Sequence, residues 1–107
     1  MNKVLTAMLL TVGVYSTAQA AVVDMSSMPA AMGSCNIVVN AYFTATDPNV
    51  KLAAQQAVGK INRIRNTLNF QDGQTYERAK VATQQQFNRF SPDAQYQAFR
   101  QCWQLVK

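Results

Sequence analysis

The clearest pattern of hydrophobic and polar positions lies in the middle of the chain. From Pro48 to about Phe70, apolar residues recur at alternating steps of four and three, which places them on one face of an α-helix. This face consists of Val50, Ala54, Ala57, Ile61, Ile64 and Leu68. Asp47-Pro48 marks its start, because aspartate accepts hydrogen bonds from the free N–H groups and proline has none to lose. The pattern predicts an amphipathic helix over 48–70.

Two more helices are expected after it. Gln71-Asp72-Gly73 predicts a turn, since glycine readily adopts the positive φ of a chain reversal. Thr75 then caps a third helix, with Glu77 in its first turn. The inward residues of this helix are Tyr76, Ala79, Thr83, Phe87 and Phe90.

Ser91-Pro92 repeats the start signal, and the fourth helix is expected to reach about Val106. Its central stripe is Ala98, Cys102, Leu105 and Val106, flanked by Phe99.

The first helix is predicted over 34–46, with Ser34 as its amino-terminal cap. Ile37-Val38-Val39 is β-branched and would suit a strand, but a lone strand would have nothing to pair with. Residues 21–33 are expected to form an irregular lead-in, because Ser26-Ser27, Pro29 and Gly33 interrupt regular structure. The sequence thus predicts a single all-α domain over 34–107.

The first 20 residues have the pattern of a signal peptide. Lys3 precedes an apolar run over 4–15, and Ala18-Gln19-Ala20 supplies small residues for cleavage after Ala20. The run is shorter than the roughly 18 apolar residues that span a bilayer, so no transmembrane segment is expected in the mature chain. Removing 20 of 107 residues leaves 87. The protein is therefore expected to be periplasmic or secreted.

Cys35 and Cys102 are expected to pair, because an exported chain enters an oxidising compartment. Lipidation of Cys35, after Met32-Gly33-Ser34, is the alternative, but the apolar run ends about twenty residues earlier. A disulfide closing so long a loop contributes about 4 kcal/mol in the chain-entropy model. The pairing predicts a small, disulfide-clasped antiparallel bundle of four helices, or of three if the first segment is irregular.

The inventory of side chains disfavours catalysis and cofactor chemistry. The chain has no histidine and only five acidic residues, so the commonest acid–base group and metal ligand is missing. Met25, Met28 and Met32 could hold Cu(I) through their thioethers, but flexible methionines also fill gaps against a core. We expect no enzyme activity, cofactor or metal.

Binding is the remaining class of function. Tyr96, Phe99 and Trp103 are spaced along one side of the fourth helix beside Arg100, and aromatic residues with arginine commonly anchor protein interfaces. The same residues could instead simply widen the buried face. The leading hypothesis is that this chain binds a protein partner in the envelope and acts as an enzyme inhibitor, a toxin-immunity factor or an assembly accessory. A periplasmic chaperone is a minor alternative.

The net charge of +5 allows a second hypothesis. Lys60 and Arg63 share a helical face and could bind an anionic lipid headgroup or polysaccharide, whereas Arg65 points away from Arg63. Basic residues late in a helix also simply complement its dipole. No nucleic-acid partner is expected, and the sequence does not determine the oligomeric state.

Overall fold

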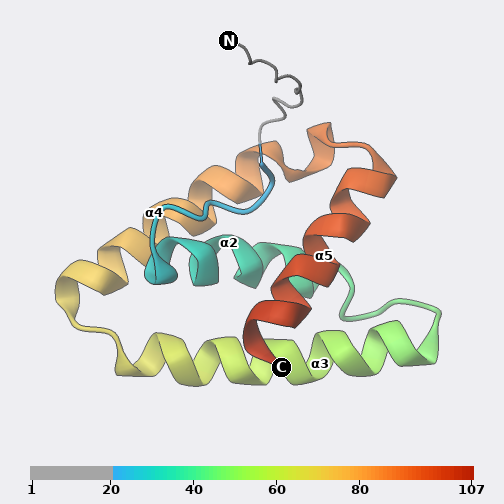
Figure 1. Cartoon of the computed structure of the whole chain (residues 1–107), viewed down its shortest axis with the longest axis horizontal. Coiled ribbons are helices and arrows are strands. Elements are labelled where there is room, and N and C mark those ends of the chain that lie inside the picture. Colours follow the sequence, from blue (N-terminus) through green and yellow to red (C-terminus); the bar gives the residue numbers. More distant parts are fainter. Residues whose placement is uncertain (1–20) are drawn as a thin grey trace, which may run out of the picture.

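The helix that begins the fold, α2 (Met28–Ala41), lies at its centre. In the computed structural model, which describes residues 21–107, it is followed by α3 (Pro48–Thr67), α4 (Phe70–Gln86), the 3₁₀-helix η1 (Phe87–Arg89) and α5 (Pro92–Val106). α2 packs most extensively against α4 and also contacts α3 and α5, and α3 contacts α5 (Figure 1). The predicted signal peptide lies outside the described residues.

Each α-helix begins at a side chain that caps its first free N–H groups. Ser27 Oγ accepts from Ala30 N at 3.2 Å, Asp47 Oδ1 from Asn49 N at 2.8 Å, Asn69 Oδ1 from Asp72 N at 2.8 Å and Ser91 Oγ from Ala94 N at 3.1 Å. Three of these helices also carry proline in the first turn. The predicted starts of α3 and α5 are confirmed.

The start of α2 differs from the prediction. Ser27, not Ser34, is the cap, so the irregular lead-in covers only 21–27 and the helix ends at Ala41 instead of Thr46. Pro29 occupies the first turn, where its missing N–H and fixed φ are tolerated. Pro29, which the sequence analysis treats as a break in regular structure, therefore belongs to the start of α2.

The turn between α3 and α4 also differs from the prediction. α3 ends at Thr67, and Asn69 caps α4, so Gln71-Asp72-Gly73 is helical. Gly73 N–H donates to Asn69 O at 2.8 Å, which is a helical hydrogen bond. Thr75 is inside α4, where its hydroxyl donates to Gln71 O at 3.2 Å instead of capping. The chain reverses through two extended residues, Leu68 and Asn69.

Small residues let α2 and α4 approach closely. Gly33 lies so near α4 that an added Cβ would be 2.9 Å from the carbonyl carbon of Tyr76. Ser34, which has no exposed surface, accepts a hydrogen bond from the buried Thr83 hydroxyl at 2.8 Å. The core thus has a backbone-to-backbone contact and a buried polar bridge at its most extensive interface.

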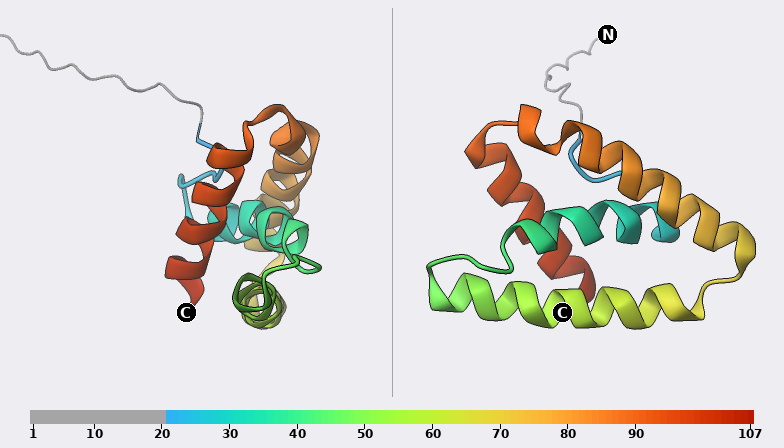
Figure 2. Two further views of the ribbon diagram at one scale, coloured as in Figure 1. Left: turned by 90° about the vertical axis from the view of Figure 1, so that its right-hand side faces the viewer. Right: turned by 180° about the vertical axis from the view of Figure 1, so that it is seen from behind.

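The Cys35–Cys102 disulfide joins α2 to α5, with 5.5 Å between the two Cα atoms. Both cysteines are fully buried. Because α2 starts at Met28, Cys35 lies in its middle rather than at its start, and α5 crosses α2 obliquely (Figure 2). The predicted fold class, an all-α bundle of four helices with this disulfide, is confirmed.

Candidate interaction surface

Three aromatic rings form a cluster where α5 passes the carboxyl end of α2. Tyr42, which follows the last residue of α2, has its ring centroid 4.7 Å from that of Phe99 and 6.0 Å from that of Tyr96. Tyr96 and Phe99 are themselves 6.0 Å apart. Such offset or edge-on pairs stabilise by about 0.5–1.5 kcal/mol beyond the area that they bury. The cluster fixes the first half of α5 against the end of α2.

The predicted aromatic–basic stripe of α5 divides between core and surface. Phe99 is only 3% exposed and belongs to the core, whereas Tyr96 is 39% exposed. Trp103 is half-buried and Arg100 is exposed. The structure therefore leaves Tyr96, Arg100 and Trp103 accessible to a partner, with Phe99 supporting them from below.

The exposed part of this stripe borders a groove of about 270 Å³ between α3 and α5. We call it the α3–α5 groove. α3 supplies one wall and α5 the other, with Asn49, Val50 and Ala53 facing Tyr96, Phe99, Arg100, Trp103 and Gln104. The α3 residues and Tyr42 were not predicted as site residues. For the α3 residues, the only signal in the sequence is the apolar face of that helix, which includes Val50.

Arg100 is the single charged side chain in the lining of the α3–α5 groove. Within residues 21–107 the structure contains one ion pair, between Arg65 Nε and Glu77 Oε2 at 3.3 Å. Arg100 therefore has no carboxylate partner among the described residues. The lining of the groove therefore combines apolar residues, two accessible aromatic rings and one positive charge that has no ion-pair partner among the described residues.

The predicted anion-binding pair lies on a separate surface. Lys60 and Arg63 border a shallow depression of about 500 Å³ together with Gln55, Gln56 and Gly59. Arg65 instead faces α4, where it pairs with Glu77 and stands 5.3 Å above the Tyr76 ring. The three basic residues therefore do not form one patch.

Burial changes the acidity of two tyrosine hydroxyls among the described residues. Burial, followed by the nearby Tyr96 phenol, raises the pKa of Tyr42 above its ordinary value of 10.0. Burial is also the main cause that raises the pKa of Tyr76, against an opposing hydrogen bond with Asn36. Both hydroxyls therefore stay protonated at neutral pH, when they can donate hydrogen bonds.

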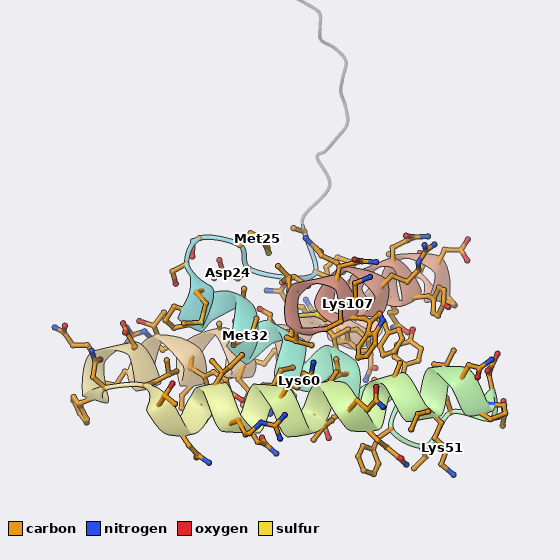
Figure 3. All side chains as sticks on the ribbon, turned by 60° about the horizontal axis from the view of Figure 1, so that its bottom comes forward. Asp24, Met25, Met32, Lys51, Lys60 and Lys107 are labelled. Atoms are coloured by element: carbon orange, nitrogen blue, oxygen red, sulfur yellow. A yellow bond between two sulfur atoms is a disulfide. The ribbon has the colours of Figure 1, made fainter. Side chains whose placement is uncertain are left out.

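Among residues 21–107, no three His, Cys, Asp or Glu side chains gather in a position to hold a metal ion. Met32 is buried in the core, whereas Met25 and Met28 are half exposed. Figure 3 shows Met25 on the irregular segment and Met32 on α2, apart from one another. Met32 thus packs in the core, whereas Met25 and Met28 are exposed.

Comparison with known proteins found no matching family model, curated protein or solved structure. In the part of the chain that the structure describes, no helix combines the length and the apolar character needed to cross a membrane.

Proposed function

We propose that the mature chain is an exported protein that acts by binding another protein through the α3–α5 groove. The observation that carries the proposal is Arg100, an exposed guanidinium with no ion-pair partner among residues 21–107, beside the accessible rings of Tyr96 and Trp103. Arginine and aromatic side chains bury large areas at interfaces and dominate their binding energies.

The chemistry of the groove defines the partner segment that it fits. An apolar side chain would contact the apolar lining residues Val50, Ala53 and Phe99. A neighbouring aspartate or glutamate would pair with Arg100, whose planar fork suits a carboxylate. At about 270 Å³ the groove is smaller than the pockets of about 300–1,000 Å³ that usually hold small molecules. It therefore suits one or two side chains of a protein.

The export step of the proposal rests on the signal-peptide pattern and on the disulfide. Disulfides persist in oxidising compartments and are rare in the cytosol. The Cys35–Cys102 bond supports such a compartment. Steric inhibition of an envelope enzyme, immunity against a toxin and assistance in assembly would all use a rigid surface of this kind, without catalysis by this chain.

The test is affinity capture from an envelope extract, followed by binding measurements with the purified partner. We expect Arg100→Ala with Trp103→Ala to weaken binding at least tenfold, whereas Lys60→Ala with Arg63→Ala should change it little. Arg100→Glu should also abolish binding, and replacing the contacting acid of the partner by a basic residue should then restore it. Unchanged affinity of the folded Arg100/Trp103 variant would rule out the groove.

A second function, binding to an anionic envelope component, is favoured by one observation. Lys60 and Arg63 border the same depression as Gln55 and Gln56, so two charges and two amides converge there. Exposed charges are screened over about 8 Å at physiological ionic strength. Binding to vesicles with anionic lipid, or to acidic polysaccharide, should therefore weaken with added salt and with Lys60→Ala plus Arg63→Ala. Salt-independent binding would contradict this function.

A further inference from the structure

The residues directly after the predicted cleavage site are held against the bundle. We call residues 21–27 the N-terminal strap. Val23 in the strap has no exposed surface, and Val22 packs against the core. Asp24 N–H donates to Ser34 Oγ at 3.1 Å, and Ser26 N–H donates to Asp24 Oδ1 at 3.0 Å. The strap is thus anchored within a few residues of Ala21.

The start of the strap lies beside the first half of α5. Ala21 and Val22 border a depression of about 450 Å³ whose other lining residues all come from α5. These are Asp93, Ala94, Gln97, Ala98 and Gln101. Figure 2 shows the strap next to α5 when the molecule is seen from the side. Asp93 is the only charged side chain in this lining, and it lies in the first turn of α5.

Cleavage after Ala20 changes the chemistry at this place. Hydrolysis of the Ala20–Ala21 bond consumes one water and leaves a carboxylate on Ala20 and an α-amino group on Ala21. That amino group, neutral as an amide before cleavage, becomes an ammonium with three hydrogen-bond donors at neutral pH. The strap therefore gains a positive charge beside Asp93.

We infer that the depression on α5 is a docking site for the chain's own new N-terminus, in which the Ala21 ammonium pairs with the Asp93 carboxylate. The amide oxygens of Gln97 and Gln101 supply further acceptors in the same lining. Ala21 is two residues from the buried Val23, so its nitrogen stays within about 7 Å of that anchor. Each extra residue would move the ammonium by up to about 3.5 Å. Signal-peptide removal thus completes the packing of α5.

The test uses the mature chain beginning at Ala21, prepared from a fusion whose protease leaves no extra residue. NMR of the labelled N-terminus should give an α-amino pKa above the ordinary value of about 7.7–8.0, because a carboxylate favours the ammonium. Asp93→Asn should return this pKa to the ordinary range. Asp72→Asn is the matched control, since it removes an acid from the first turn of α4, outside the depression.

Thermal unfolding gives a second measurement. A Gly-Ser extension before Ala21 should lower Tm by about 1–5 °C in the wild type and by less in Asp93→Asn, as expected for an exposed ion pair in a small domain. An α-amino pKa that is the same with and without Asp93 would overturn the docking site. The inference rests on cleavage after Ala20, and N-terminal sequencing of the exported protein tests that step separately.

Discussion

Gly33 lies against the backbone of Tyr76, so that the close approach of α2 and α4 depends on the missing side chain. A Cβ at position 33 would meet the Tyr76 carbonyl carbon at 2.9 Å and Lys80 N at 3.1 Å, with the Tyr76 carbonyl oxygen closer still. These are backbone atoms of a helix, which cannot move aside as a flexible side chain can. The two helices would have to separate to accept even a methyl group.

We therefore predict that Gly33→Ala lowers the free energy of unfolding by about 1–3 kcal/mol, the usual cost of overpacking. Gly59→Ala is the matched control, because Gly59 is also helical and nothing lies within 4 Å of its added Cβ. This variant should gain up to about 1 kcal/mol from helix propensity. Urea denaturation measures both. Equal effects of the same sign would contradict the close approach.

The Ser34–Thr83 bridge is predicted to be the costliest polar pair to break. Ser34→Ala leaves the buried Thr83 hydroxyl and the Asp24 N–H without their acceptor, which should cost about 1–3 kcal/mol. Adding Thr83→Val removes the orphaned hydroxyl while nearly conserving volume, so the double variant should recover part of the loss. A double-mutant cycle from chemical denaturation measures the coupling, and strictly additive effects would show that the bridge contributes nothing.

Loss of the disulfide is predicted to destabilise the fold through α5. Replacing both Cys35 and Cys102 by alanine should lower stability by about 2–4 kcal/mol. Because both cysteines are fully buried, dithiothreitol should act on the native protein only after local opening. Reduction should therefore accelerate sharply in mild denaturant. Rapid reduction in buffer alone would contradict the buried position.

Alkaline pH is predicted to weaken the fold. Burial raises the pKa of Tyr42 and of Tyr76 above 10.0, so the unfolded chain ionises first and is favoured as pH rises. Stability should stay level with respect to these groups below about pH 10 and fall above it, through the folded-state pKa values. Tyrosinate absorbance of the native and guanidinium-unfolded protein locates the two transitions. Tyr42→Phe should reduce the alkaline loss.

Capping residues followed by proline were sufficient to predict where two of the helices begin. Asp47-Pro48 and Ser91-Pro92 combine an acceptor with a proline, and the structure uses both as helix starts. The same combination exists at Ser27 and Pro29, but Ser26 and Gly33 nearby are residue types that favour an irregular segment. Gly73 is a residue type that favours a turn, yet it lies inside α4, because α3 ends at Thr67 and Asn69 caps α4.

Only the α5 side of the candidate groove could be predicted from the sequence. The spacing of Tyr96, Arg100 and Trp103 places them on one helix, which local periodicity can predict. Their alignment with Asn49 and Val50 depends on how α5 crosses α3, and that is set by packing against α2 and by the disulfide. Two interpretations are open for Phe99 in the sequence, an interface residue or part of a widened buried face, and its burial against the Tyr42 ring supports the second.

Because α2 is central, its buried residues should tolerate substitution less well than the exposed residues of the outer helices. Within residues 21–107 every other α-helix contacts α2, and the residues of α2 from Pro29 to Cys35 are all buried. Random substitutions there should be tolerated poorly, because one change disturbs several interfaces. The exposed residues of the α3–α5 groove, Asn49, Arg100 and Gln104, stand on the outer helices, where a new side chain changes the groove while the core residues keep their contacts. This division would allow the same scaffold to be retargeted to new partners at little risk to folding.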